Sequence, residues 1–247
     1  MENNHLETVR KFYPNAATTT DSVSKLFAIL KENYNLEPRQ IMHADSICSD
    51  DVNAIEYPKN ASEMLGPFKM GGLNGFPFTG LTGMGAFAGH VPEDGAVFVY
   101  YAPHIGITKE GTTGEIHRIG QSKTSGCCGA AKAALSNLLN DQIIPGNITH
   151  LDFQFNTIEQ IFFLQKERIK SAEIPLLEAT NVMYEAIEER INIHAERTKY
   201  PCKYLILMGG ILINGDFDMG SFNDCRRFEI IDLETGKKSY LMEEYLS

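Results

Sequence analysis

Three cysteines and one histidine of this 247-residue sequence are of the types that bind a transition metal. Cys48, His104 and either Cys127 or Cys128 would supply two thiolates and one imidazole, which suit the borderline softness of Zn2+. A catalytic zinc site uses three protein ligands and leaves a fourth position for water. These residues are far apart in the sequence, so the signal is weaker than a compact Cys-x-x-Cys motif. Two buried cysteines and a core histidine bonded to a carbonyl would give the same pattern.

Two neighbouring features add to this chemistry. Asp50 follows Cys48 by two residues, so its carboxylate could hydrogen-bond metal-bound water or take the open position; an N-cap for residues 51–56 is the alternative. Cys127 and Cys128 open an Ala/Leu-rich stretch, and a helix N-terminus favours a thiolate. A metal-free thiol enzyme, with one of these cysteines as nucleophile and His104 as base, is therefore a second hypothesis.

The elements that must position these residues follow from hydrophobic periodicity. An amphipathic helix is predicted over 21–34, where Val23, Leu26, Phe27 and Leu30 recur at helical spacing. Further helices are predicted over 126–140 and within 157–198, where a break near Pro175 gives two. Strands are predicted over 39–47, 96–102, 148–155 and 203–214, with a terminal hairpin from 228–232 and 238–242.

This alternation predicts an α/β fold with a central mixed, partly parallel sheet flanked by helices. Sites in such sheets lie at the carboxyl ends of strands. Cys48 and His104 each follow a predicted strand, and Cys127 and Cys128 start a helix. We therefore expect them to converge.

Composition limits the other function classes. The length fits one domain over 1–247, and we expect residues 1–20 to form an N-terminal arm. The net charge of −10 argues against nucleic-acid binding. The longest apolar stretch, 204–213, is short of the roughly 20 residues that span a bilayer, so no membrane association is expected. No secretory signal is evident, so we expect a cytoplasmic protein, whose five cysteines are not a disulfide framework.

Several motifs then resemble one family. Cys48-Ser49-Asp50 resembles the Cys-x-Asp element of β-carbonic anhydrases. A closer resemblance is to the limiting-CO2-inducible B/C family, a β-like group also called θ, and it extends over roughly 20–230. It rests on the motifs Gly75-Phe-Pro-Phe-Thr-Gly80, His90-Val-Pro-Glu-Asp-Gly95, Tyr101-Ala-Pro-His-Ile-Gly106, Arg118-Ile-Gly-Gln121 and Cys128-Gly-Ala-Ala131.

The resemblance implies a β-carbonic-anhydrase-like fold, a homodimer and a Zn2+ site of Cys48, His104 and Cys128, since the family motif places the ligand directly before glycine. It also implies reversible hydration of carbon dioxide to bicarbonate. Typical β enzymes carry an arginine two residues after the aspartate, where this chain has Val52. Arg118 is the candidate substitute; a solvated loop arginine is the alternative.

The remaining candidate residues each have more than one possible role. For His90, packing or support of the site ranks first, proton transfer second and metal ligation third. Five apolar residues lie among the glycines: Phe76, Phe78, Leu81, Met84 and Phe87. They could line a small apolar pocket for uncharged carbon dioxide, or they could simply pack against the sheet or a dimer partner. Gly83-Met84-Gly85 precedes no predicted helix, so nucleotide binding is weakly supported. A catalytically silent, zinc-containing bicarbonate sensor or partner-binding protein of the same fold remains the alternative function.

Overall fold

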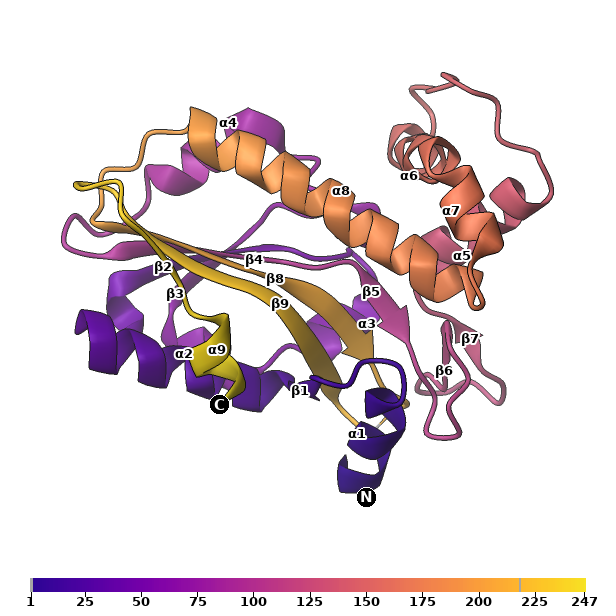
Figure 1. The fold of residues 1–247 in the computed structure, drawn as a ribbon, viewed down its shortest axis with the longest axis horizontal. Helices are drawn as coiled ribbons and strands as arrows, with labels where there is room; N and C mark the ends of the chain where they lie inside the picture. The colour runs from indigo at the N-terminus through magenta and orange to yellow at the C-terminus, as the bar shows by residue number, and fades with distance from the viewer. Residues whose placement is uncertain (1, 218) are drawn as a thin grey trace.

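Four neighbouring strands of the main sheet run parallel (Figure 1). They are β8 (Tyr204–Asn214), β4 (Ala96–Tyr101), β2 (Ile41–Ser46) and β3 (Leu65–Lys69), in that spatial order. On the other side of β8 lies antiparallel β9 (Ser221–Asp232), which pairs in turn with β1 (Ala17–Thr18) and β10 (Lys238–Tyr240). The computed structural model describes residues 2–217 and 219–247. The sheet is mixed, as the sequence predicts.

Helices cover both faces of this sheet, and each face has its own core (Figure 1). On one face lie α4 (Gly80–Ala88), α5 (Gly129–Leu139), α6 (Phe153–Leu164) and α8 (Pro175–Arg197). On the other lie α2 (Thr19–Tyr34) and α9 (Met242–Leu246). Every residue of β2 and β8 is buried, which explains the long apolar sequence of β8. In β2 the polar side chains of His43, Asp45 and Ser46 are buried as well. The α/β class is therefore confirmed.

The remaining elements are short. They are α1 (Glu2–Arg10), α3 (Asp51–Ile55), α7 (Lys166–Ser171), β5 (His104–Gly106), β6 (Glu115–Ile116), β7 (Ser125–Gly126) and three 3-10 turns at Pro38–Gln40, Lys59–Glu63 and Leu73–Gly75. Within the expected N-terminal arm, α1 packs His5 and Val9 into the interior. Among the described residues, no helix is long and apolar enough to cross a membrane.

Three predictions of local structure were wrong. Residues 148–155 are not a strand: Ile148 and Leu151 lie exposed in a loop, and α6 begins at Phe153. Residues 157–198, expected to form two helices, contain most of α6 followed by α7 and α8, although the predicted break near Pro175 is confirmed because α8 begins there. Gly83 and Gly85 lie inside α4, because burial of Met84 and Phe87 outweighs the low helix propensity of glycine.

The sheet brings the candidate residues together at one edge. Ser46, which ends β2, pairs with Tyr101, which ends β4, so the chain emerges from both strands side by side. Cys48 follows the first strand and His104 the second. His104 starts β5, which pairs with the last residues of β8. The carboxyl ends of three parallel strands thus define the position of the site.

Candidate metal centre

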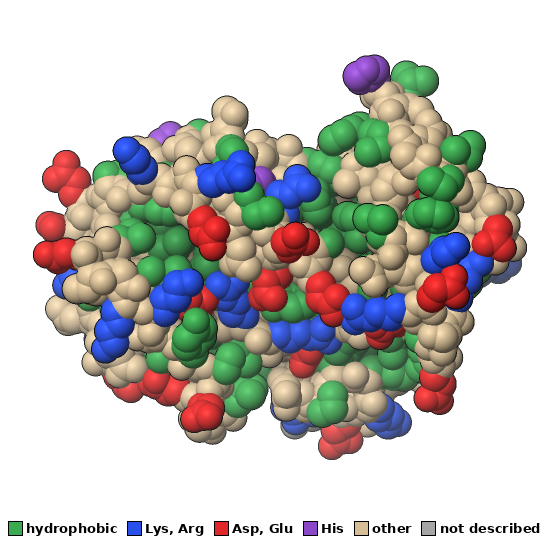
Figure 2. Space-filling model, turned by 45° about the horizontal axis from the view of Figure 1, so that its top comes forward, with side chains coloured by type: hydrophobic (Ala, Val, Ile, Leu, Met, Phe, Trp, Pro, Cys, Tyr) green, Lys and Arg blue, Asp and Glu red, His purple; other side chains and the backbone are tan. Residues whose placement is uncertain are grey.

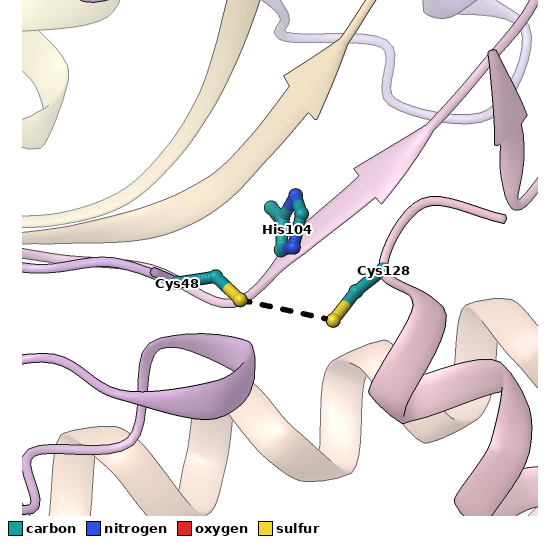
Figure 3. Close-up of side chains that lie close together, drawn as sticks. All are labelled: Cys48, His104 and Cys128. Atoms are coloured by element: carbon teal, nitrogen blue, oxygen red, sulfur yellow. Dashed lines mark hydrogen bonds between the residues drawn. The ribbon is translucent and has the colours of Figure 1, made fainter. Parts of the chain in front are cut away.

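Cys48, His104 and Cys128 converge at this edge of the sheet. The two sulfur atoms lie 3.9 Å apart and point toward each other beneath the imidazole of His104 (Figure 3). One potential ligand atom from each of the three residues lies within 4.8 Å of the others. The exposed fractions are 5%, 1% and 3%, so bulk water does not compete for these atoms. The three side chains could hold a metal ion.

The imidazole of His104 is oriented for ligation. Its Nδ1 donates a 2.7 Å hydrogen bond to Oδ1 of Asn214, the last residue of β8. The other nitrogen, Nε2, is buried and has no hydrogen-bond partner among the described residues. A buried imidazole nitrogen without a partner is costly unless a cation takes its lone pair. Sequence reasoning missed Asn214, although a polar residue directly after a buried strand is a usable signal.

The sulfur separation fits zinc. With Zn–S bonds of about 2.3 Å and tetrahedral angles, two thiolates are expected about 3.8 Å apart. The observed 3.9 Å between Cys48 and Cys128 agrees. The hydrogen bond to Cys128 and burial together raise the pKa of the Cys48 thiol. A divalent cation between the sulfurs reverses this effect, because a coordinating thiol loses its proton. The donor set therefore fits the metal that the sequence predicts.

The glycine-rich loop after β3 supports Cys48. The backbone N–H of Asn74 donates to Sγ of Cys48 at 3.1 Å, which would stabilise a thiolate. Asn74 and Gly75 have φ of 51° and 81°. A Cβ on Gly75 would lie 2.2 Å from the carbonyl oxygen of Ala102, so only glycine permits this close approach. The loop geometry explains part of the glycine content of this segment.

Asp50 forms an ion pair with Arg118, at 2.9 Å between Oδ2 and a guanidinium nitrogen. Asp50 is also the N-cap of α3, where it accepts from the N–H of Val52 at 3.3 Å. Burial alone would raise the pKa of Asp50, but its hydrogen bonds with Arg118 and Asp51 outweigh this and lower it. The N-cap interpretation of Asp50 is therefore confirmed, and Arg118 is held in an ion pair rather than solvated.

The loop that carries Arg118 is tied to the end of β8. The carboxylate of Asp216 accepts from the backbone N–H groups of Lys109 at 2.9 Å and His117 at 2.7 Å. The guanidinium of Arg118 donates further to Oγ of Ser125 at 3.0 Å. These bonds hold Arg118 beside Asp50. Sequence reasoning missed Asp216.

Cys127 belongs to a second group of close ligand atoms, with Asp50 and His104. Its sulfur lies 3.5 Å from Nδ1 of His104, the nitrogen that already donates to Asn214. Cys127 also packs with Val52 and Ile116 in a small buried cluster. The grouping with Cys48 thus involves Cys128.

His90 and the predicted pocket residues lie elsewhere. His90 is exposed in the turn before β4, with its ring 6.2 Å from that of Phe68, while His104 follows the far end of β4. Its ring therefore contacts Phe68, away from the candidate metal centre. Of the five predicted pocket residues, Phe76, Met84 and Phe87 are buried core side chains, and Phe78 packs against the core. Leu81 is 43% exposed. None of the five lines the cavity beside Arg118 or the smaller cavity beside His43.

A cavity of about 380 Å3 opens beside Asp50 and Arg118 instead, and we call it the mouth cavity. Its apolar wall consists of Val52, Ile55, Ile116, Ile119 and Phe217. Its polar wall includes Glu56, His117 and Arg118. A charge-free substrate can therefore meet an apolar wall next to the ion pair. The predicted pocket residues pack inward because the glycine-rich chain that carries them runs close to the core.

The sequence from 17 to 232 matches the family model described as limiting CO2-inducible proteins B/C beta carbonic anhydrases. The chain belongs to this family. The resemblance seen in the motifs is thereby confirmed over most of the chain, whereas no curated protein matches the sequence.

Solved structures of the limiting CO2-inducible family share the fold. The chain is similar to PtLCIB4, described as a homologue of the limiting CO2-inducible protein LCIB, with a TM-score of 0.82 and 28% identity over 95% of this chain and 98% of that one. For the H88A mutant of PtLCIB4 the TM-score is 0.84, with 28% identity over 97% of this chain and 99% of that one. For LCIB itself the TM-score is 0.72, with 20% identity over 93% of this chain and 95% of that one. This similarity supports the fold alone.

Proposed function

We propose that this protein is a zinc enzyme that catalyses the reversible hydration of carbon dioxide to bicarbonate and a proton. The observation that carries the proposal is the unpartnered Nε2 of His104 beside two sulfurs 3.9 Å apart, next to an Asp50–Arg118 ion pair. Membership of a β-carbonic anhydrase family supports the same reaction.

Each group has a distinct task in the proposed reaction. Bound zinc would supply a water molecule whose pKa is lowered toward about 7. Asp50, held ionised by Arg118, accepts a hydrogen bond from the attacking oxygen and orients it. Val52 and Ile116 of the mouth cavity provide an apolar surface for carbon dioxide. Asn214 and the N–H of Asn74 keep His104 and Cys48 in place.

Metal analysis combined with a hydration assay tests the proposal. We expect one zinc per chain and hydration above the buffer rate between pH 7 and 9. Cys48→Ala should lose both zinc and activity, because one thiolate of the set is removed. Cys225→Ala is the matched control, since Cys225 is also a buried thiol but lies in the opposite core. Activity that survives chelation would instead favour the thiol enzyme.

A catalytically silent zinc protein that senses bicarbonate or binds a partner is the second candidate. One observation favours it: a carboxylate oxygen of Asp50 lies within 4.8 Å of ligand atoms from His104 and Cys127. An aspartate on the metal would fill the position that substrate water needs. Zinc-loaded protein without hydration activity at any pH from 7 to 9 selects this candidate.

We also propose a homodimer that forms through the lobe of α5, α6 and α7. Figure 2 shows hydrophobic side chains gathered on this side of the molecule. The exposed large apolar residues between α5 and α7 are Leu139, Ile144, Ile148, Leu151, Phe153 and Leu164. Sedimentation should give twice the chain mass for the wild type. The double variant Leu151→Asp, Leu164→Asp should sediment with the mass of one chain. A reducing compartment such as the cytoplasm suits the five free cysteines of the described chain.

A further inference from the structure

One carboxylate beside the candidate centre has no role so far. Glu56 is the C-cap of α3, and Asp50 is its N-cap. Residues 50, 53 and 56 are three apart, so they share one side of this short helix. Asn53 donates to the carbonyl oxygen of Cys48 at 3.1 Å, which shows that this side faces the site.

Glu56 is linked to the metal ligand through a single side chain. Nδ2 of Asn214 donates to Oε2 of Glu56 at 3.1 Å, and Oδ1 of the same amide accepts from Nδ1 of His104 at 2.7 Å. Glu56 is half-buried and lines the mouth cavity, which is open to solvent. It also lines a second, inner cavity of about 60 Å3. The carboxylate therefore lies between the centre and the outside.

Charged groups surround Glu56 on several elements. Arg118, Asp51 and His117 line the mouth cavity together with Glu56, and the charges of Asp50 and His104 also act on its carboxyl group. Burial raises the pKa of Glu56 to about 8, against the lowering effects of Asn214, Arg118 and His104. A carboxyl group in this range can both accept and release a proton near neutral pH.

The other groups near the mouth are less suited to carry protons. Asp50 is held ionised by Arg118. Nδ1 of His117 is engaged by Asp216 at 3.0 Å. His90 lies in the turn before β4.

We propose that Glu56 is the proton-transfer residue of this site. The inference rests on the proposed function. Hydration converts carbon dioxide and water into bicarbonate and one proton. The Glu56 carboxylate accepts that proton through solvent in the mouth cavity, becomes a neutral carboxyl group, and passes the proton to a buffer base outside.

Exchange of 18O between labelled carbon dioxide and water tests this transfer on zinc-loaded protein. The method separates the rate of carbon dioxide–bicarbonate interconversion from the rate of release of labelled water, which needs a proton. For Glu56→Gln we expect interconversion within twofold of wild type and water release at least tenfold slower at low buffer concentration. Added imidazole should restore the release. Glu63→Gln, on the exposed turn after α3, is the matched control.

The outcomes separate the two proposals. Absence of interconversion in wild type overturns the proposed function, and the inference with it. If Glu56→Gln retains both interconversion and the wild-type rate of water release, the inference alone is overturned. The same holds if water release is slow in His117→Gln but not in Glu56→Gln. A purely structural role of Glu56 would lower both rates together.

A second measurement does not depend on turnover. Carbon-13 spectra of the glutamate carboxyl groups should show one that titrates near pH 8 and disappears in Glu56→Gln. If every glutamate carboxyl titrates below pH 6, Glu56 cannot exchange protons in the required range and the inference fails.

Discussion

The side-chain amide of Asn214 accepts the Nδ1 proton of His104 at 2.7 Å, and so fixes which imidazole nitrogen is free. Both residues lie on paired strands, because β5 runs parallel to the end of β8. The orientation of the candidate ligand is therefore set by the sheet rather than by a loop. A rigid support of this kind normally strengthens metal binding.

Removal of this support should weaken zinc binding. For Asn214→Ala we expect a loss of affinity of about ten- to a hundredfold, since His104 loses the acceptor that fixes its tautomer. Competition with a fluorescent chelator measures this. Asn214→Asp keeps an acceptor and should recover most of the affinity. The control is Asn223→Ala, another buried asparagine, which accepts from Tyr100. Equal losses in both alanine variants would contradict the prediction.

The adjacent cysteines should behave differently. Cys128→Ala removes the sulfur that lies 3.9 Å from Cys48, so we expect protein without zinc. Cys127→Ala should retain zinc, because the sulfur of Cys127 contacts Nδ1 of His104 rather than the free nitrogen. Metal content after gel filtration, with circular dichroism as a check of folding, decides between them. The reverse result would assign the ligand to Cys127.

Loss of the Asp50 ion pair should stop the chemistry and spare the metal. Arg118→Gln removes the cation that holds Asp50 in position, so we expect hydration to fall by about a hundredfold with one zinc retained. Arg168→Gln serves as control, because Arg168 pairs with Glu185 on the exposed side of α8. If Arg118→Gln keeps full activity, the arginine does not take the place of the residue missing at Val52.

A buried histidine should make the fold sensitive to acid. Burial and Lys69 lower the pKa of His43 to about 3, whereas the unfolded chain has an ordinary value of 6.5. Between these values the unfolded state binds more protons, so the free energy of unfolding falls as the pH drops below 6.5, by up to about 1.4 kcal/mol per pH unit.

Urea denaturation at pH 7, 6 and 5 measures this slope. His43→Gln should flatten it, while the same change at His150, which is exposed, should leave it as in wild type. An unchanged slope in His43→Gln would show that another group is responsible.

The sequence predicts the buried strands because their apolar runs are encoded locally, whereas the choice of Cys128 rests on the family resemblance. Continuous apolar runs predict β4 and β8, and the side chains that follow strands mark the site. The supporting residues are harder to predict: Asn214 and Asp216 act on residues about 100 positions away. The place of Arg118 in the glycine-rich loop makes it a candidate, but its contact with Asp50 depends on the path of that loop. The strand prediction for residues 148–155 was wrong because exposed apolar side chains there alternate with polar ones, as they do in a half-buried strand.

The arginine and the candidate ligands belong to structurally separate parts of the chain. Cys48 follows β2 and His104 starts β5, whereas Arg118 lies on the segment between β5 and α5, which Asp216 holds at its base. A change confined to this segment would therefore displace the guanidinium without altering Cys48 or His104. Holding the cofactor and completing the reactive machinery are thus separable properties of this polypeptide.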